Sequence, residues 1–176
     1  MEVILVRHTS VDVPKGMCYG QSDVPVRDTF EEEAEATRRL LAPYQPFDDV
    51  YASPLTRARK LAAYCGYPQP RLDNRLKEMH MGEWEMQMYD EIQDVRLDDW
   101  YRDYMHLPTP GGESFPELYQ RVATFLDELK TKDYQRVAIF AHGGVLISAG
   151  LYAGLFGEQD AWDHLVDYGG IERIEI

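Results

Sequence analysis

Four short segments of this chain have the composition of β-strands. The run at 3–6 is wholly apolar, the segments at 49–52 and 136–141 are mostly apolar, and 171–176 mixes apolar with charged residues. Runs rich in Val and Ile suit buried parallel strands, whereas a run mixed with charges suits an edge strand, because one side stays in water. We therefore expect a central sheet that is mostly parallel, with the segment at 171–176 at its edge.

Between these strands, apolar residues recur at helical spacing. Capping-box patterns at 29–32 and 114–117 predict the starts of two helices. The pair Ser53-Pro54 predicts a third start, with Ser53 as the N-cap and the proline in the first turn. The inner faces of the first two helices are expected to carry Phe30, Ala34, Thr37 and Leu41, and Leu118, Val122, Phe125 and Leu129.

Strands that alternate with helices predict a layered α/β domain, and two further helices are expected at 89–104 and 145–155. The length of 176 residues suits one domain, and 44% hydrophobic with 28% charged residues is typical of a globular protein. No linker, internal repeat or low-complexity tract interrupts the chain. We expect a single domain over residues 1–176, built as a three-layer α/β/α sandwich around the mostly parallel sheet.

The charge of the chain disfavours some classes of partner. With 18 Lys and Arg against 31 Asp and Glu, the formal net charge is −13, which argues against nucleic acid and anionic membrane surfaces. Because charges are screened over about 8 Å at physiological salt, a local cationic pocket for a small anion is compatible with this total. We expect a small-molecule partner, and the oligomeric state is not fixed by the sequence.

The cysteines and the apolar segments bear on the compartment. Cys18 and Cys65 predict neither a disulfide framework nor a metal motif, which favours a reducing, cytoplasmic compartment, and the first residues lack the pattern of a signal peptide. The segment 137–157 contains no Asp, Glu, Lys or Arg and is long enough to span a membrane. His142-Gly143-Gly144 at its centre would be a poor choice in lipid, so a buried strand, turn and helix is the preferred interpretation.

Arginine and histidine side chains follow three of the predicted strands. Arg7 and His8 come directly after the first strand, Arg57 shortly after the second, and His142 directly after the third. The carboxyl ends of parallel strands meet at one edge of a sheet, where ligands of open α/β sheets collect. Singly, each residue is more often an ordinary surface or turn residue. Together, two imidazoles and two guanidiniums suit a phosphoryl group, whose transfer depends on positioning and on neutralising oxygen charge.

This convergence predicts a division of roles. Arg7 and Arg57 would clamp phosphate oxygens, and a neutral His8, kept unprotonated by the neighbouring cations, would attack phosphorus and form a phosphohistidine. A protonated His142 would donate to a phosphate oxygen. The backbone N–H groups of the Gly143-Gly144 turn, at a helix start, would assist it in binding the anion.

A leaving oxygen also needs a proton. Glu78, which precedes an apolar and aromatic stretch, is the candidate general acid, and it could then activate the water that hydrolyses the phosphoenzyme. Glu83 and Glu85 compete with it on composition alone. No His-Glu-x-x-His spacing and no His/Cys cluster occurs, so no metal site is predicted.

Five motifs occur in order along the chain: Arg7-His8, the run 53–58, Glu78 ahead of 82–85, the run 110–114, and 141–144. Together they resemble the histidine phosphatase superfamily, also called the phosphoglycerate mutase-like family, over nearly the whole chain. The resemblance implies a phosphoglycerate mutase-like fold and a phosphohistidine at His8, with neither metal nor cofactor. It also implies phosphate binding by Arg7, Arg57 and His142, and proton donation by Glu78.

Within that superfamily, the segments 16–25 and 84–86 look most like the α-ribazole phosphatases of cobalamin synthesis. These enzymes remove the phosphate from α-ribazole 5′-phosphate during assembly of the nucleotide loop. Gln21 and Ser22 would hydrogen-bond the substrate or, equally, stabilise their own turn. Thr9 stands where the superfamily usually has a glycine, and we expect its hydroxyl to donate to the phosphate instead.

Other functions share the same core residues. A broad-specificity phosphatase and a phosphoglycerate mutase are the alternatives among enzymes, and the short chain argues against the mutase because the resemblance to mutases implies longer insertions. A phospholigand-binding module without turnover is a third possibility, which the presence of both His8 and Glu78 disfavours. Four aromatic side chains could line a base-binding pocket or pack a core: Tyr89, Trp100, Tyr101 and Tyr104.

Overall fold

The computed structural model describes residues 1–176 and is built on a five-stranded sheet. The strand order is β4-β3-β6-β1-β7, and every neighbouring pair is parallel except β1 with β7. The expected mostly parallel sheet, with the last strand at its edge, is confirmed. The strands are β1 (Glu2–Arg7), β3 (Asp49–Ala52), β4 (Arg71–Leu72), β6 (Arg136–Ala141) and β7 (Ile171–Glu175).

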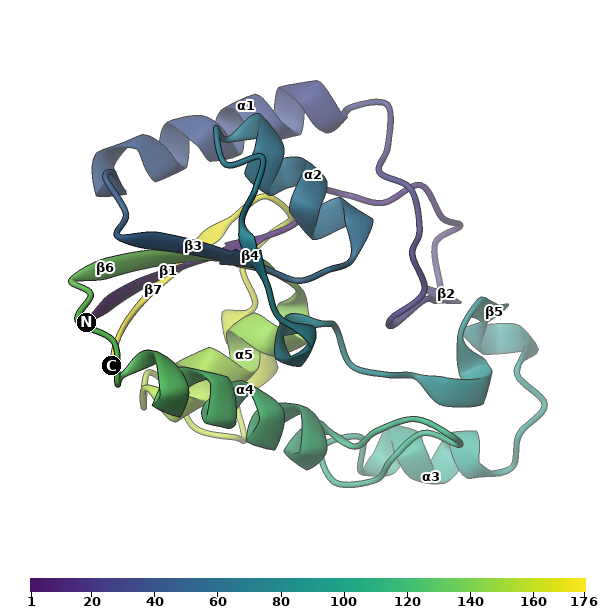
Figure 1. Ribbon diagram of the computed structural model, residues 1–176. Helices are drawn as coiled ribbons and strands as arrows, with labels where there is room; N and C mark the ends of the chain where they lie inside the picture. Colours follow the sequence, from purple (N-terminus) through teal and green to yellow (C-terminus); the bar gives the residue numbers. More distant parts are fainter.

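Helices cover both faces of this sheet, as Figure 1 shows. α1 (Phe30–Leu41) and α2 (Thr56–Tyr64) lie on one side, and α4 (Phe115–Leu129) and α5 (Gly143–Tyr152) lie on the other. Val3 and Leu5 of β1 join the apolar cluster under α4 and α5, whereas Ile4 and Val6 join the cluster under α1 and α2. A strand covered on both faces is apolar at every position, which explains the unbroken run and confirms the three-layer sandwich.

A second, smaller part of the chain runs away from the sheet between α2 and α4 (Figure 1). There β5 (Gln87–Met88) pairs in antiparallel fashion with β2 (Met17–Cys18), which comes from the loop between β1 and α1, and α3 (Arg96–Arg102) is the one α-helix. Short 3-10 helices make up the rest of the regular structure in this part: η2 (Asn74–Leu76), η3 (Gly82–Trp84) and η4 (Tyr89–Glu91). Elsewhere, η1 (Ala42–Tyr44) extends α1 and η5 (Ala161–His164) precedes β7.

The helix expected at 89–104 is wrong in extent. The chain makes a single 3-10 turn at η4 and begins α3 only at Arg96. The carboxylate of Asp94 accepts a hydrogen bond from the backbone N–H of Arg96 and binds the guanidinium of the same residue, so the helix begins beside this aspartate. A local side-chain contact of this kind fixes the start of a short helix more strongly than the apolar spacing does.

The caps of two of the three predicted helices are also corrected, although α1 does begin at the predicted position. Thr29 precedes α1 but makes no capping bond, because its hydroxyl donates to the carboxylate of Glu33, which also binds Ser10. Ser53 does not cap α2, which begins at Thr56; its Oγ accepts from the N–H of Leu55 before the helix starts. The capping box at Ser114 is confirmed, with both of its reciprocal hydrogen bonds formed.

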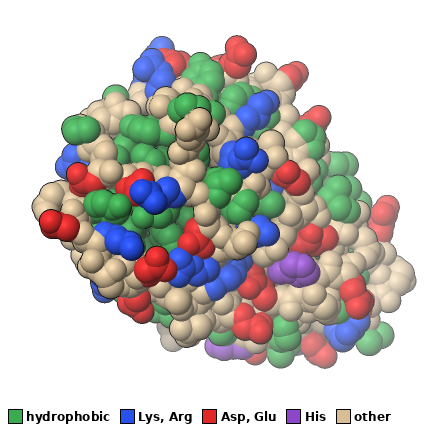
Figure 2. All heavy atoms as spheres, viewed as in Figure 1, with side chains coloured by type: hydrophobic (Ala, Val, Ile, Leu, Met, Phe, Trp, Pro, Cys, Tyr) green, Lys and Arg blue, Asp and Glu red, His purple; other side chains and the backbone are tan.

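The apolar segment at 137–157 forms a buried strand, a turn and a helix, as expected. β6 ends at Ala141, His142 makes the turn, and eight residues of α5 are buried against the sheet and α4. None of the helices combines the length and the apolar character needed to cross a membrane. On the face shown in Figure 2, acidic side chains lie among the basic ones, in keeping with the net charge of −13.

Candidate active site at the ends of three strands

The sheet brings the predicted Arg and His residues together at one edge. Arg7 is the last residue of β1 and lies opposite Ala141 of β6, so His8 and His142 both follow directly at neighbouring strand ends. Arg57 lies in the first turn of α2, four residues beyond Ser53, which follows β3. The parallel register therefore confirms the convergence, because equivalent strand ends are held side by side by the backbone ladder.

His8 is poised as a neutral base with one free nitrogen. Its ring is 2% exposed, and Nδ1 lies 2.7 Å from the carbonyl oxygen of Thr9. Because a carbonyl only accepts, Nδ1 carries the proton and Nε2 keeps its lone pair. Burial, and then the positive charge of Arg57, lower the pKa of His8 to about 3. This lowered pKa agrees with the expected unprotonated His8, and Nε2 is the ring nitrogen left with a lone pair.

His142 differs from the expectation in its charge. Its side chain is fully buried, and its ring lies 5.2 Å from that of His8 in an edge-to-face arrangement. Burial, with the charge of Arg57 as the next cause, holds the pKa of His142 well below its usual value. The lowered pKa favours a neutral ring over the expected protonated His142, because a further cation so close to two guanidiniums and out of water is disfavoured. Its Nε2 lies 2.7 Å from Ser53 Oγ.

Both guanidiniums are held by backbone carbonyl groups. Arg57 is fully buried, and it donates from its two terminal nitrogens to the carbonyls of Ser22 and Gly20, each at 2.8 Å. Arg7 donates to the carbonyl of Val166 at 2.6 Å. In each arginine the Nε–H group is buried without a partner, which leaves a donor for an anion at both.

Two tyrosines that the sequence did not mark cover these groups. The ring of Tyr168 lies 4.1 Å from the guanidinium carbon of Arg7, and the ring of Tyr19 lies 5.2 Å from that of Arg57. The two tyrosine hydroxyls are 3.2 Å apart, so a hydrogen bond links the two rings that cover the arginines. The only hints in the sequence are neighbouring glycines, because Gly20 follows Tyr19 and Gly169 follows Tyr168.

Glu78 is the carboxylate that reaches this site. Its Oε1 accepts from the N–H of Met79 at 2.9 Å and from that of Gly144, at the start of α5, at 3.2 Å. A Cβ on Gly144 would lie 2.5 Å from the same oxygen, so the glycine admits the carboxylate. The N–H of Gly144 is therefore engaged by Glu78, and of the glycine pair only the N–H of Gly143 is left for an anion.

The two competing carboxylates have other positions. Glu85 accepts hydrogen bonds from the backbone of Gln21 and Met81 and from the hydroxyl of Ser22, so it holds a loop together. The side chain of Glu83 is 70% exposed. Composition could not separate these residues from Glu78, whereas the fold does, since Glu78 alone contacts the start of α5.

A residue outside every predicted motif positions Glu78. Arg121 of α4 donates to the backbone carbonyls of Arg75, Lys77 and Glu78 and is paired with Glu113. These bonds fix the course of the chain immediately before the catalytic candidate. No pattern in the sequence marks Arg121, because it is one charged residue of an amphipathic helix.

The predicted substrate contacts of the first loop are used within the protein. Gln21 donates its side-chain amide to the carbonyl of Glu78 at 3.0 Å, and the Ser22 hydroxyl binds Glu85 at 2.5 Å. These contacts tie the first loop to the segment 78–85, so the two side chains neither point into open space nor bond within their own turn. The Thr9 side chain is fully buried, and its hydroxyl has no hydrogen-bond partner.

An apolar cavity of about 520 Å³ opens beside Glu78, in the smaller part of the chain. All four aromatic residues singled out in the sequence line it, and Trp100 packs edge-to-face on Trp84 at 5.7 Å. Tyr19 belongs both to this wall and to the cover of Arg57, so the cavity adjoins the phosphate side of the site. The lining residues include Met17, Cys18, Tyr19, Glu78, Met79, Met81, Tyr89, Trp100, Tyr101, Tyr104, Phe115 and Trp162.

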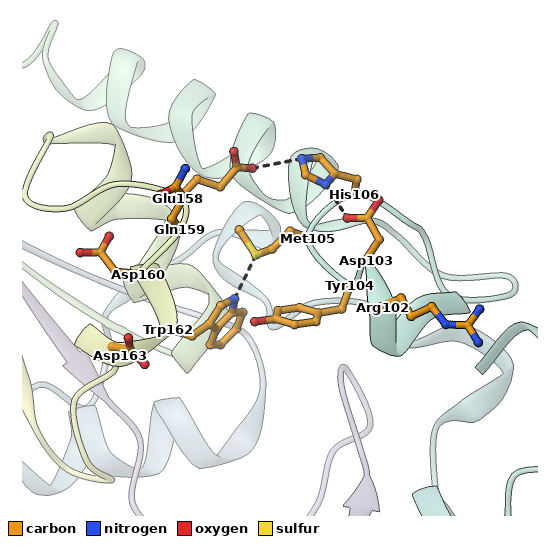
Figure 3. Close-up of a pocket in the computed structure, with 10 residues that line it drawn as sticks. All are labelled: Arg102, Asp103, Tyr104, Met105, His106, Glu158, Gln159, Asp160, Trp162 and Asp163. Atoms are coloured by element: carbon orange, nitrogen blue, oxygen red, sulfur yellow. Dashed lines mark hydrogen bonds and ion pairs between the residues drawn. The ribbon is translucent and has the colours of Figure 1, made fainter. Parts of the chain in front are cut away.

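A second pocket, of about 420 Å³, lies behind one wall of the first and is drawn in Figure 3. Tyr104 and Trp162 line both pockets, and Trp162 donates its indole N–H to the sulfur of Met105. The remaining lining has four carboxylates against one arginine and one histidine, which suits a phosphate less well than the cluster at the strand ends does. No set of three His, Cys, Asp or Glu side chains is grouped closely enough to hold a metal ion.

Known proteins resemble this chain over most of its length. Residues 3–176 match the family model of the histidine phosphatase superfamily (branch 1). The chain is 32% identical to putative phosphoserine phosphatase 2 of Hydrogenobacter thermophilus, over 98% of this chain and 88% of that protein. It is 30% identical to the adenosylcobalamin/alpha-ribazole phosphatase of Salmonella typhimurium, over 83% of this chain and 76% of that one. The structure of the alpha-ribazole phosphatase from Shigella flexneri matches it with a TM-score of 0.87 at 29% identity, covering 100% of this chain and 91% of that one.

Proposed function

The chain belongs to the histidine phosphatase superfamily and is a phosphoric monoester hydrolase, and we propose that it works through a phosphohistidine on His8. The observation that supports this mechanism is that Nε2 of the neutral His8 keeps its lone pair beside the guanidiniums of Arg7 and Arg57. A nucleophile needs its lone pair, and a phosphoryl group needs cations on its oxygens. The site offers both within one buried cluster.

In the first half-reaction, Nε2 of His8 attacks phosphorus in line while the bond from phosphorus to the ester oxygen breaks. Arg7 and Arg57 neutralise charge on the phosphoryl oxygens, and the N–H of Gly143 and the ring N–H of His142 add neutral donors. Protonated Glu78 gives its proton to the leaving oxygen, so the alcohol departs uncharged.

In the second half-reaction, the carboxylate of Glu78 takes a proton from water as the water oxygen attacks phosphorus. The bond from phosphorus to Nε2 breaks, and His8 regains its lone pair. The hydrogen bond from Nδ1 to the Thr9 carbonyl, 2.7 Å long, is present throughout and stabilises the charge that the ring carries as a phosphohistidine. Inorganic phosphate and the restored Glu78 acid complete the cycle.

For the substrate, we propose α-ribazole 5′-phosphate, and hence a role in assembling the nucleotide loop of cobalamin. The cavity beside Glu78 supports this choice, because the leaving group must lie on the side of the general acid. Its walls of tyrosine, tryptophan and methionine suit a flat, apolar heterocycle linked to a sugar. Relatives named as alpha-ribazole phosphatases lend further support.

The alternative substrates fit this cavity less well. Phosphoserine and phosphoglycerate carry carboxylates, and a carboxylate needs a cation or several donors when it leaves water. Eleven of the 13 residues that line the cavity are hydrophobic. A binding module without turnover has no need of a general acid, which the position of Glu78 supplies. The buried free thiols of Cys18 and Cys65 suit the reducing cytoplasm, where we propose that the enzyme works.

A single-turnover experiment with radiolabelled α-ribazole 5′-phosphate tests the mechanism. We expect acid-labile label on the wild-type protein, and we expect His8→Ala to abolish both label and turnover. The matched control is His106→Ala, whose side chain is 58% exposed at the second pocket and which should label normally. Full activity in His8→Ala would refute the phosphohistidine mechanism.

Steady-state kinetics test the substrate separately. The kcat/KM for α-ribazole 5′-phosphate should exceed that for phosphoserine and 3-phosphoglycerate by at least about a hundredfold, roughly 2.7 kcal/mol of transition-state binding. An equal or higher value for phosphoserine would replace the proposed substrate without affecting the mechanism. Transfer of phosphate between the positions of phosphoglycerate without net release would identify a mutase.

A further inference from the structure

Ser53 and His142 form a buried pair whose protons can be assigned by counting donors and acceptors. Both side chains are fully buried, and His142 Nε2 lies 2.7 Å from Ser53 Oγ. His142 Nδ1 has no hydrogen-bond partner in the protein. Because burial among cations keeps the ring neutral, one of its two nitrogens carries a proton and the other a lone pair.

The serine decides which nitrogen carries the proton. Ser53 Oγ already accepts a hydrogen bond from the N–H of Leu55 at 3.2 Å, and its one hydroxyl proton needs an acceptor. The only acceptor in contact with it is His142 Nε2. If Nε2 carried the proton instead, two donors would point at Oγ and the buried hydroxyl proton would have nowhere to go, which is costly.

We propose that Ser53 is a positioning residue, which donates its hydroxyl proton to Nε2 of His142 and so keeps the ring proton on Nδ1. Nδ1–H is then a donor that no group of the protein accepts. It lies on a ring 5.2 Å from the ring of His8, so an oxygen of the phosphoryl group on its way to His8 is the acceptor that completes it. This step rests on the proposed phosphohistidine mechanism.

The fold fixes Ser53 for this task. Its backbone N–H donates to the carbonyl of Phe140 at 2.9 Å, which extends the ladder between β3 and β6 by one residue. The carbonyl of His142 in turn accepts from Leu146 in the first turn of α5. Both partners are thus tied to the backbone of the sandwich, and their separation is set without any loop. His142 can then donate a hydrogen bond to a phosphate oxygen from Nδ1 while its ring is neutral. A ring without such a fixed partner would have to be protonated to guarantee a donor at Nδ1.

Proton–nitrogen correlation NMR on isotope-labelled histidine tests the assignment directly. The His142 signals are identified by their loss in His142→Asn. We expect the wild-type ring to show a protonated Nδ1 and a bare Nε2. In Ser53→Ala, which removes the donor, we expect the proton to redistribute to Nε2. Ser53→Thr keeps the hydroxyl and should restore the wild-type spectrum. A wild-type proton on Nε2, or an unchanged spectrum in Ser53→Ala, would overturn the proposal.

Activity gives the second readout. Ser53→Ala should lower kcat for α-ribazole 5′-phosphate about 10- to 100-fold with little change in KM, as expected for an orienting partner, and Ser53→Thr should recover most of it. The control is Ser148→Ala, another fully buried serine, whose hydroxyl donates only to the carbonyl of Gly144 and whose loss should leave kcat within about twofold. Equal losses in Ser148→Ala and Ser53→Ala would contradict a specific role.

The two levels of the argument fail in different ways. If the phosphohistidine mechanism is wrong, His8 carries no label while the NMR spectra still show Nδ1–H. If the role of Ser53 is wrong, His8 is labelled normally and the spectra or the rescue by threonine disagree. Near-ultraviolet circular dichroism of Ser53→Ala and Ser53→Thr verifies that both variants keep the wild-type packing.

Discussion

The two halves of the candidate site are built in different ways. On the phosphate side, His8, Arg57 and His142 follow strands of one sheet, and all three are at most 2% exposed. On the leaving-group side, the walls come from 3-10 turns, the short pair β2–β5 and a helix of seven residues, and Tyr101 and Tyr104 are 51% and 39% exposed.

The difference teaches where each property of the enzyme resides. Groups that need fixed distances stand on a backbone ladder that many residues share. Groups that select the leaving group stand on short elements whose packing involves few neighbours, so they can be exchanged without disturbing the chemistry. Four substitutions test this separation.

The largest effect is expected at the junction of the two halves, in Glu78→Gln. Turnover of α-ribazole 5′-phosphate should fall about 10²- to 10⁴-fold, because the glutamine gives no proton to the leaving alkoxide. With 4-nitrophenyl phosphate, whose leaving group needs no proton, stopped-flow absorbance should show a burst of one equivalent followed by slow turnover.

The burst distinguishes the two roles of Glu78. It shows that the first half-reaction proceeds without the acid when the leaving group needs no proton, whereas the slow phase reports loss of the base in the second half-reaction. The control is Glu83→Gln, whose side chain is 70% exposed and which should behave as wild type. Equal losses with both esters and no burst would mean that Glu78 only orders the site.

The next largest effect is expected in the pH dependence of the free energy of unfolding, which should change for a variant of the phosphate side and not for one of the leaving-group side. Burial holds the pKa of His8 at about 3, against 6.5 in the unfolded chain, so only the unfolded state gains a proton as the pH falls below 6.5. The free energy of unfolding should therefore drop between pH 6.5 and 4.5, and His8→Asn should remove about 2 kcal/mol of that drop. Urea unfolding at both pH values measures it.

A variant of the leaving-group side is the comparison for this prediction. Tyr104→Ala should keep the wild-type difference in unfolding free energy between the two pH values, because it leaves His8 and its burial unchanged. If His8→Asn kept the full difference, His8 would have to be protonated in the folded protein, and the nucleophile would need another explanation.

A smaller effect is expected from Tyr104→Ala on specificity. Removing one aromatic wall should lower kcat/KM for α-ribazole 5′-phosphate about tenfold and leave that for 4-nitrophenyl phosphate nearly unchanged. Tyr64→Ala is the matched control, since Tyr64 is 37% exposed but lies on α2. Equal losses with both substrates would mean that the cavity supports the catalytic groups rather than the leaving group.

The smallest effect concerns the tyrosine cover that joins the halves. Tyr168→Ala removes the ring above Arg7 and the hydroxyl contact with Tyr19. The rate at which diethyl pyrocarbonate modifies His8, followed by peptide mass spectrometry at pH 6, should rise by about fivefold, because access to a ring that is 2% exposed limits the reaction. An unchanged rate would show that the cover already opens freely.

Much of the fold and the core of the site could be predicted from the sequence, for one shared reason. Arg7, His8 and His142 lie within one residue of a strand end, so a prediction of the strands was enough to bring them together. The protonation of His142 could not be predicted in the same way. It depends on complete burial among Arg57, His8 and helices from distant parts of the chain.

The sequence was least informative where single contacts decide the structure. The start of α3 depends on the carboxylate of Asp94, and the interpretation of Ser53 as a helix cap was wrong because its hydroxyl faces His142. The contact between Tyr19 and Tyr168 joins residues 149 positions apart. Neither tyrosine lies at the end of a strand that the sequence predicts, so the pattern that brings Arg7 and His142 together does not extend to this contact.

The glycine at the start of α5 has a consequence for reading mutational scans of this family. A Cβ at Gly144 would lie 2.5 Å from Glu78 Oε1 and 2.8 Å from Cδ2 of Leu118, a fully buried core residue of α4, so a side chain there would disturb both the carboxylate and the packing of α4 on α5. A scan scored by activity and one scored by abundance should therefore both mark position 144 as intolerant. An investigator who counted this glycine among the residues that hold phosphate would be misled, because its N–H binds Glu78 and its missing side chain makes room for that acid and for Leu118.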